Sequence, residues 1–229
     1  MNAATNTATP PVTKVIDLET ALDGIEDGMT LLVGGFGPSG SPLALLGEVA
    51  RRGVRGLTIV SNNAGGVDNG IGLLIARGRV ERMVCSYPAG REPAAIKDPA
   101  NRERVQLDLV PQGVLAERVR AGGAGLGGVL IRTGLDLPYM SGYEVVETGG
   151  ERFLLAPAIR GDFALISAQT ADPDGNLVYA PGAANFNPLM AMASKVTVAE
   201  VGTVTERSAF EPQFIHTPSI FTDRVVITA

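Results

Sequence analysis

Short apolar runs alternate along the chain with stretches in which apolar residues recur every three or four positions. The run Met29-Thr30-Leu31-Leu32-Val33 is almost continuously apolar, as in a strand that is buried on both faces. Six further runs have the same character and are predicted to be strands, at 57–60, 82–85, 105–110, 163–167, 195–201 and 225–228. With helical stretches between them, these runs predict βα units around a mostly parallel sheet.

The first helix is predicted over 18–27, because Leu18, Leu22 and Ile25 share one helical face. Asp17 can cap the start of this helix, and Gly28 can end it. Further helices are predicted at 42–51, 69–76, 113–120 and 188–194, and a short strand at 177–179 after the turn signal 172–175.

The predicted fold class is therefore α/β, with an open, mostly parallel sheet and flanking helices. Residues 1–13 are small, polar and proline-containing, and we expect a disordered tail there, followed by a single domain over 14–229. The segment 122–151 is glycine-rich and weakly periodic, so the pattern does not place it. It is a candidate for a subdomain, a flap or part of an interface.

Composition narrows the class of protein. A net charge of −5 argues against a nucleic-acid-binding surface, and no segment has the roughly 18 consecutive apolar residues of a membrane span. The single cysteine, Cys85, excludes an internal disulfide and fits a reducing cytoplasm, and we expect it in the core. The 29 glycines in 229 residues predict many tight turns and close backbone approaches.

The segment 27–42 carries the most chemical information, since it predicts a strand, a glycine-rich loop and a helix start. Ser41 is placed to cap the helix, and Pro42 suits its first position. Glycines let a backbone approach a ligand closely, and exposed N–H groups at a helix start favour an anion or an oxyanion. The loop 34–40 is therefore the candidate binding site.

Two familiar phosphate-binding loops do not fit this segment. The loop lacks the Gly-Lys-Ser/Thr ending of a P-loop. Gly35, Gly37 and Gly40 match the Gly-x-Gly-x-x-Gly spacing of a dinucleotide site formally. However, the second predicted strand leads into Ser61-Asn62-Asn63, which offers no acidic residue for a ribose.

The segment 27–42 resembles the first signature of family I CoA-transferases: an Asp-Gly pair, an apolar strand, Gly-Gly-Phe and then Gly-x-Pro. Further segments resemble the alpha subunit of that family, so that the resemblance covers nearly all of 14–229; they are 60–65, 70–74, 115–125, 168–172, 175–177 and 215–218. The resemblance implies the NagB/RpiA/CoA-transferase-like fold and one subunit of a two-subunit enzyme.

Enzymes of this family move CoA from a donor thioester to an acceptor carboxylate through a glutamyl-CoA intermediate. The nucleophilic glutamate lies in a Ser-Glu-Asn-Gly motif of the beta subunit, and this chain has no such motif. The resemblance therefore implies a beta-subunit partner in a heterodimer or heterotetramer, with acyl-CoA and a carboxylic acid as substrates. It implies no metal, no cofactor besides the CoA ester, and no nucleophile in this chain.

The resemblance also assigns candidate site residues. The loop that binds CoA and stabilises the oxyanion is expected to comprise Gly34, Gly35, Phe36, Gly37, Pro38, Ser39 and Gly40, with Gly35 and Phe36 the strongest candidates. Asn62 and Asn63 are candidates for hydrogen bonds near the acyl group, and the alternative for both is a helix cap or an Asx turn.

Other polar residues are weaker candidates. His216, the only histidine, is expected to be a structural or interface residue. Tyr139 and Tyr143 are candidates for the entrance to the site. Glu117 and Arg118 are expected to form a surface or interface pair on a helix. Glu144 and Glu147 are expected to lie on one helical face or in a loop.

Succinyl-CoA is the expected donor, with a 3-oxoacid such as 3-oxoadipate or acetoacetate as acceptor. The chain departs from the 3-oxoacid enzymes at 126–131 and 135–144, and substrate choice is expected to depend on these segments. Two alternatives stay open. One is a sugar-phosphate isomerase or deaminase of the same broad fold, which the absence of Lys or Arg near the glycine-rich loop disfavours. The other is a non-catalytic module that binds acyl-CoA.

Overall fold

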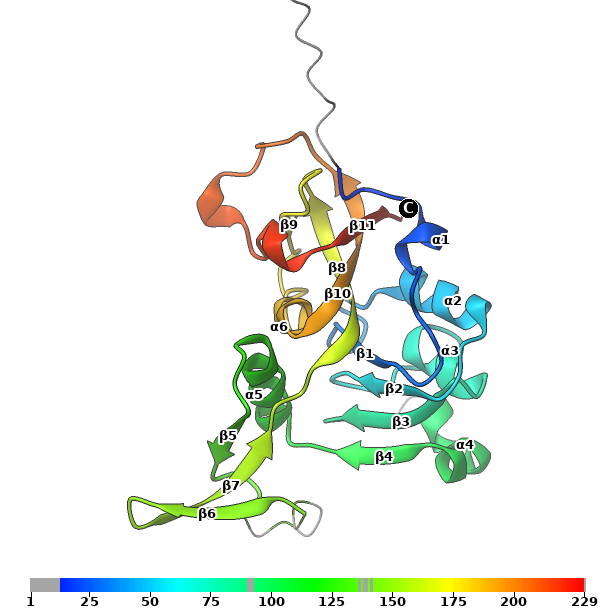
Figure 1. The fold of residues 1–229 in the computed structure, drawn as a ribbon. Helices are drawn as coiled ribbons and strands as arrows, with labels where there is room; N and C mark the ends of the chain where they lie inside the picture. Colours follow the sequence, from blue (N-terminus) through cyan, green and yellow to red (C-terminus); the bar gives the residue numbers. More distant parts are fainter. Residues whose placement is uncertain (1–12, 90–92, 136, 138–139, 141, 229) are drawn as a thin grey trace, which may run out of the picture.

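The computed structural model of the protein describes residues 13–89, 93–135, 137, 140 and 142–228. Its strands, within these residues, form a large sheet and a small sheet (Figure 1). The large sheet has the order β11-β10-β8-β1-β2-β3-β4, and every neighbouring pair along this path is parallel. A short strand, β9, pairs antiparallel with β8. The predicted α/β fold with an open, mostly parallel sheet is confirmed.

The strands of the large sheet are β1 (Thr30–Val33), β2 (Leu57–Val60), β3 (Val80–Cys85), β4 (Gln106–Leu109), β8 (Gly161–Ala171), β9 (Leu177–Val178), β10 (Ser194–Val204) and β11 (Arg224–Ile227). All seven predicted apolar runs overlap strands, and both ends match only for β2. Strands β8 and β10 extend beyond their apolar runs because they pair with each other from Ser194 opposite Gly161 to Val204 opposite Ala171. Backbone pairing therefore continues where side-chain hydropathy no longer indicates a strand.

Helices cover both faces of the large sheet; they are α1 (Leu18–Ala21), α2 (Leu43–Arg52), α3 (Gly70–Ala76), α4 (Pro99–Arg104), α5 (Gln112–Gly123) and α6 (Asn187–Met192). Short 3-10 helices are η1 (Ala95–Lys97), η3 (Pro212–Phe214) and η4 (Ser219–Phe221). Figure 1 shows α2 and α3 on one side of the sheet and α5 and α6 on the other. Leu31 belongs to the core under α2 and α3, whereas Leu32 belongs to the core under α5 and α6. This alternation explains why the strands are apolar throughout.

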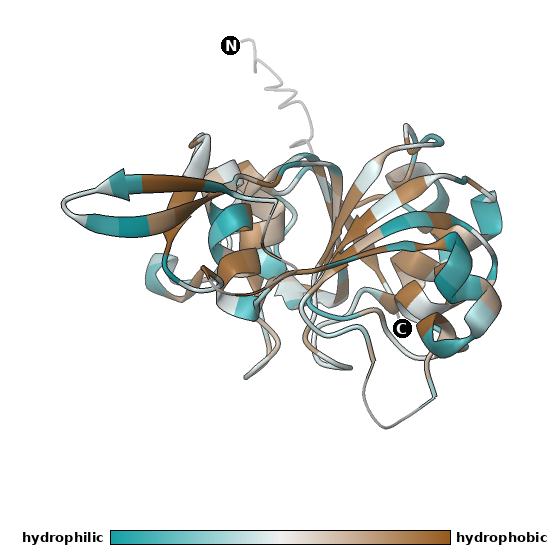
Figure 2. Cartoon of the chain, turned by 90° about the horizontal axis from the view of Figure 1, so that it is seen from below, coloured by the Kyte–Doolittle hydropathy of each residue, from teal (hydrophilic) through white to brown (hydrophobic). Residues whose placement is uncertain are grey.

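The segment 122–151, which the sequence pattern did not place, contributes strands to the small sheet. This sheet is antiparallel, with the order β5-β7-β6, and consists of β5 (Gly128–Ile131), β6 (Glu144–Thr148) and β7 (Glu151–Pro157). Gly149 and Gly150 both have positive φ, at 60° and 77°, and form the two-residue turn between β6 and β7. Figure 2 shows this hairpin extending away from the large sheet.

The expectation for Glu144 and Glu147 was wrong, because both residues lie on β6 rather than on a helix or in a loop. Their separation of three positions places them on opposite faces of the small sheet. Side chains on opposite faces of a sheet do not act together on one substrate atom.

Two helices also differ from prediction. The first helix ends at Ala21 instead of reaching 27, since Gly24 has a φ of +95° that a right-handed helix does not adopt. Its predicted cap is confirmed, because Asp17 accepts a hydrogen bond from the Thr20 N–H at 2.8 Å. Helix α4 was not predicted, although Asp98 caps it and Pro99 opens it in the favoured pattern.

Cys85 is fully buried in the core, as expected, and burial raises the pKa of its thiol to about 12. The thiol therefore stays protonated and unreactive. No helix in the described part of the chain has the length and apolarity needed to span a membrane. Of the predicted tail, residues 1–12 lie outside the described residues and Thr13 is exposed. The single domain over 14–229 stays a prediction.

Two glycines of helix α5 provide a matched test of its packing. A Cβ atom on Gly122 would lie 1.9 Å from the backbone oxygen of Ile159, whereas a Cβ atom on Gly113 meets nothing within 4 Å. We expect Gly122→Ala to lower the free energy of unfolding by about 1–3 kcal/mol. Gly113→Ala is expected to leave it unchanged or to raise it by up to about 1 kcal/mol. Urea denaturation of both variants measures the difference, and equal stabilities would contradict the close packing.

Candidate functional site

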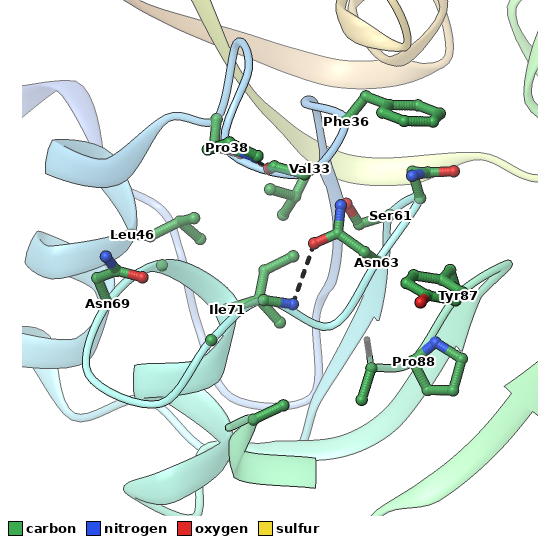
Figure 3. A pocket seen from close by; sticks show the side chains of 18 of the residues that line it. Val33, Phe36, Pro38, Leu46, Ser61, Asn63, Asn69, Ile71, Tyr87 and Pro88 are labelled. Atoms are coloured by element: carbon green, nitrogen blue, oxygen red, sulfur yellow. Dashed lines mark hydrogen bonds between the residues drawn. The ribbon is translucent and has the colours of Figure 1, made fainter. Parts of the chain in front are cut away.

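A cleft of about 710 Å³ opens at the carboxyl ends of β1, β2 and β3 (Figure 3). Its described lining comes from the segments that follow these strands and from the starts of α2, α3 and α5. Strand β1 lies between β2 and β8, so the chain order along the sheet reverses at β1. Ligands of open α/β sheets bind at such a reversal, outside the carboxyl ends of the strands.

The glycine-rich loop forms one wall of the cleft. A tight turn begins at Phe36, whose N–H donates to the Ser39 oxygen at 3.0 Å, while the Ser39 N–H donates to the Phe36 oxygen at 3.1 Å. Gly37, at a φ of +58°, lies at the tip of the turn. The Phe36 side chain is 49% exposed and borders both this cleft and a smaller one of about 310 Å³.

The candidate loop residues divide into two groups. The large cleft is lined by Gly34, Phe36, Gly37 and Pro38. Gly35, Ser39 and Gly40 are not part of its described lining, and Ser39 is exposed to solvent. A Cβ atom on Gly35 would lie 2.5 Å from Ser41 Oγ, and one on Gly40 would lie 2.5 Å from the Ala183 oxygen. The assignment of all seven as ligand contacts stays a prediction.

A buried asparagine that the sequence pattern did not reveal holds the loop in place. Asn187, at the start of α6, donates from Nδ2 to the backbone oxygens of Gly40 at 3.0 Å and Ala183 at 2.8 Å. Its Oδ1 accepts from the Ser167 N–H at 3.2 Å. A Cβ atom on Gly34 would lie 1.7 Å from this Oδ1, so only glycine fits there. The sequence gives no signal for this contact, because Gly40 and Asn187 are 147 positions apart.

The start of α2 differs from the prediction. Pro42 occupies the N-cap position rather than the first helical position, and no side chain at the N-cap accepts a hydrogen bond. Ser41, the predicted cap, instead donates from Oγ to the Gly37 oxygen at 3.0 Å. The acceptor for the helix start is Glu200 of β10, whose Oε2 lies 3.0 Å from the Leu45 N–H. A carboxylate of this chain therefore stands where we expected a ligand anion.

Glu200 is 7% exposed, and burial raises the pKa of its carboxyl group above the ordinary range. Hydrogen bonding from the N–H groups of Leu45, Ala44 and Leu43 acts in the opposite direction but is outweighed. No ionisable side chain among the described residues contributes to this pKa shift. The helix start thus offsets part of the cost of burying this charge.

Asn62 and Asn63 form the wall that follows β2, and both line the cleft. Asn62 is 3% exposed and accepts at Oδ1 from Gln112 Nε2 at 2.6 Å. Asn63 accepts at Oδ1 from the Gly65 N–H at 3.1 Å, which is the Asx turn given as the alternative for this residue (Figure 3). Gln112, the first residue of α5, also lines the cleft and was not identified from the sequence.

The described lining of the cleft is apolar and neutral, with a few amide and hydroxyl groups. Ser86 Oγ is buried there and has no hydrogen-bond partner among the described residues. The N–H groups of Gly35 and Gly37 likewise have no acceptor within the described part of the chain. Donors held in an apolar surrounding stabilise developing negative charge more strongly than the same donors in water.

The weaker candidates lie outside the described lining of the cleft. His216 accepts at Nδ1 from the Tyr179 N–H at 2.9 Å, and the two rings stack with centroids 5.9 Å apart. Tyr179 OH contacts Thr217 Oγ1 at 2.7 Å, and burial raises the pKa of Tyr179 to about 12. The contacts of His216 match the structural role that we expected.

The expected pair of Glu117 and Arg118 does not form. Glu117 pairs with Arg120 at 2.8 Å, and Arg118 instead donates to the Tyr143 hydroxyl at 2.8 Å and the Pro157 oxygen at 2.7 Å. Tyr143 therefore joins α5 to the small sheet and does not line the cleft. Tyr139 lies outside the described residues.

The coenzyme A transferase family model matches residues 15–228. The chain belongs to this family. One subunit of the 3-oxoadipate CoA-transferase from Pseudomonas putida is 41% identical over 209 residues, which cover 91% of this chain and 90% of the relative. One subunit of a probable succinyl-CoA:3-ketoacid coenzyme A transferase from Bacillus subtilis is 42% identical over 205 residues, covering 90% and 85% of the two chains. The predicted resemblance and enzyme class are confirmed.

The fold is shared with a solved acyl-CoA transferase from Escherichia coli O157:H7. The TM-score is 0.83 at 24% identity, over 96% of this chain and 49% of the other. This CoA-transferase subunit thus spans about half the length of that solved chain. At this identity the likeness establishes the fold and no finer property.

The contacts of Asn187 predict a large loss of stability when its side chain is removed. Asn187→Ala leaves the Gly40 oxygen, the Ala183 oxygen and the Ser167 N–H without their partner, and we expect a loss of about 3–5 kcal/mol. Asn69→Ala is the control, since the exposed Asn69 side chain makes no capping hydrogen bond, and its effect should stay within about 0.5 kcal/mol. Urea denaturation compares the two, and a mild effect of Asn187→Ala would contradict this role.

The raised pKa of Glu200 predicts how its contribution to stability depends on pH. In the unfolded CoA-transferase subunit this carboxyl ionises at its ordinary pKa, and in the folded one it ionises at a higher pH. Wild type should therefore lose stability relative to Glu200→Gln as the pH rises from the unfolded to the folded pKa, with a constant difference on either side. Urea denaturation of both proteins between about pH 4 and 8 measures this difference. A difference that is independent of pH would contradict the shift.

Proposed function

We propose that this chain is the alpha subunit of a two-chain CoA-transferase. The enzyme moves CoA from an acyl-CoA donor to a carboxylic acid acceptor through a glutamyl-CoA intermediate on its partner. The observation that carries this proposal is the cleft, whose described lining provides hydrogen-bond donors and apolar contacts but no carboxylate. The absence of a carboxylate among these described lining residues is consistent with a nucleophile that another chain supplies.

The related proteins support the partner and the substrates. The relatives from Pseudomonas putida and Bacillus subtilis are each named as one subunit of a CoA-transferase, and their names include 3-oxoadipate and succinyl-CoA:3-ketoacid. On this basis, the partner is a beta subunit with a Ser-Glu-Asn-Gly motif, in a heterodimer or heterotetramer in the cytoplasm. Succinyl-CoA is the donor, and a 3-oxoacid such as 3-oxoadipate or acetoacetate is the acceptor.

The reaction assigns a distinct role to each chain. The partner's glutamate attacks the thioester carbonyl, the C–S bond breaks, and an acyl-glutamyl anhydride and a CoA thiolate form. The thiolate then attacks the glutamyl carbonyl, which gives the glutamyl-CoA thioester and releases the donor's carboxylate. The acceptor carboxylate reverses these steps. In both halves, negative charge develops on a carbonyl oxygen in the tetrahedral intermediate.

The residues of this chain stabilise that charge and orient the acyl group. Gly37, which lines the cleft, offers its N–H group from a loop that Asn187 holds in place through Gly40. Asn62 and Gln112 are fixed by their mutual hydrogen bond of 2.6 Å and present amide groups from the opposite wall. Because these donors are positioned before the reaction begins, little reorganisation is needed as the charge develops.

Reconstitution of the enzyme tests this proposal. The purified chain alone should transfer no CoA from succinyl-CoA to acetoacetate, and addition of the partner should produce transfer. After incubation of the pair with acyl-CoA, borohydride reduction should modify a glutamate of the partner and no residue of this chain. Full activity of the lone chain would contradict the split site. A stable pair that transfers no CoA would favour the acyl-CoA-binding module, and isomerisation of a sugar phosphate by the lone chain would favour the isomerase.

A further inference from the structure

We propose that Glu200 is a positioning residue of this CoA-transferase: its carboxylate occupies the N-terminus of α2 and fixes the junction between the glycine-rich loop and the helix. Glu200 lies on β10 and follows Leu45 by 155 positions in the chain. It does not line the cleft and would act on the reaction through the loop. Only the activity part of its test rests on the proposed function.

The first turn of α2 needs an external acceptor. The early N–H groups of a helix have no partner within the helix, and a Ser, Thr, Asp or Asn at the N-cap normally accepts from one of them. Here the N-cap is Pro42, which has no such oxygen, and the neighbouring Ser41 hydroxyl is directed to Gly37. Leu45 is fully buried, so bulk water does not reach its N–H. Glu200 Oε2, at 3.0 Å from this N–H, replaces the missing cap.

The pairing of β8 with β10 places the Glu200 carboxylate and the group that binds Asn187 close to the junction between the loop and α2. In the sheet, Glu200 of β10 stands opposite Ser167 of β8. The Ser167 N–H is the group that binds Asn187 Oδ1, and Asn187 Nδ2 binds the Gly40 oxygen. The asparagine thus holds the end of the loop, and the glutamate holds the first turn of the helix that follows it.

The charge of Glu200 also decides what the helix start can bind. A helix N-terminus carries a partial positive charge that attracts anions, and a carboxylate placed there neutralises much of it. In this protein the positive end of α2 is already occupied, so a ligand oxyanion must use donors of the loop itself. The position of the loop is then critical, because small displacements of a donor weaken transition-state stabilisation strongly.

A second buried carboxylate, that of Glu48, has different partners from that of Glu200. It lies on α2, is 8% exposed, and pairs with Arg51 at 2.6 Å and Arg52 at 3.3 Å. Glu200 faces backbone N–H groups instead, and no described ionisable side chain contributes to its pKa shift. Burying a charge without a cation is costly, and an apolar residue would avoid that cost if only packing were needed.

The test is chemical rescue in the assembled enzyme, measured for wild type, Glu200→Ala, Glu200→Gln and the control Glu48→Gln. We expect Glu200→Ala to lower kcat at least about tenfold with a smaller change in KM for acyl-CoA, since the loop donors act mainly in the transition state. It should also lower the melting temperature. Formate supplies a carboxylate that fits the space left by the truncation, so formate should restore both kcat and the melting temperature, and chloride at equal ionic strength should restore neither.

Two controls accompany this experiment. Glu48→Gln should lower the melting temperature, and formate should not restore it. Wild type measured with formate shows how much of the rate change comes from formate acting as a CoA acceptor. An unchanged kcat in Glu200→Ala, or formate that restores the melting temperature but not kcat, would overturn the positioning role. If Glu200→Ala does not fold, the nearly isosteric Glu200→Gln decides: a loss of kcat supports the role, and wild-type kcat overturns it.

Failure of the proposed function can be told apart from failure of the positioning role. In that case the wild-type pair itself transfers no CoA. The positioning role is then tested through structure alone, by amide hydrogen exchange of Leu45 in the pair. Faster exchange in Glu200→Ala that formate slows again supports the role, and exchange equal to that of wild type overturns it.

Discussion

The site depends on a close approach between two backbone segments that belong to distant parts of the chain. At Gly34 no side chain fits, because a Cβ atom would lie 1.7 Å from the Asn187 amide oxygen. This approach joins the loop after β1 to the segment between β9 and β10, at the point where the strand order reverses. The cleft exists because the loop is held there, open towards β2 and β3 and closed towards α6.

The charged side chains around the cleft are placed in a way that suits the binding of a developing oxyanion. Exposed ion pairs such as Arg120 with Glu117 lie on the surface, where they contribute little to stability. Within the site, the described lining is neutral, and the one carboxylate at the helix start is committed to backbone N–H groups. With Glu200 bound to the helix start, the N–H groups of Gly35 and Gly37 in the loop keep no partner among the described residues, as the proposed binding of an oxyanion requires.

The sequence predicts those features that local patterns encode. Strands buried on both faces are continuously apolar, and the pattern therefore identified β1, β2 and β3. The glycines of the loop 34–40 predicted a close approach to a ligand, whereas the close approaches in the structure are to Asn187, Ser41 and Ala183. The hairpin of β6 and β7 was missed because β6 is exposed and weakly patterned, and only Leu154 and Ala156 of β7 are buried. Its Gly149-Gly150 pair was the available signal.

Features that arise from tertiary contacts were not accessible in this way. Ser41 fits the local rule for a helix cap, but the cap comes from Glu200, which only the sheet register brings to α2. Asn187 and Gln112 likewise carry no local motif, and their roles follow from partners 147 and 50 positions away. Local rules identify which loop matters, whereas the fold decides which distant side chains support it.

The most direct measurement is a crystal structure of this chain with its partner, trapped as the glutamyl-CoA thioester. The thioester carbonyl should lie in the cleft between Gly34–Pro38 and Asn62, with its glutamate supplied by the partner and Glu200 still bound to the Leu45 N–H. A thioester formed on a carboxylate of this chain, or one located away from this cleft, would contradict the division of the site between two chains.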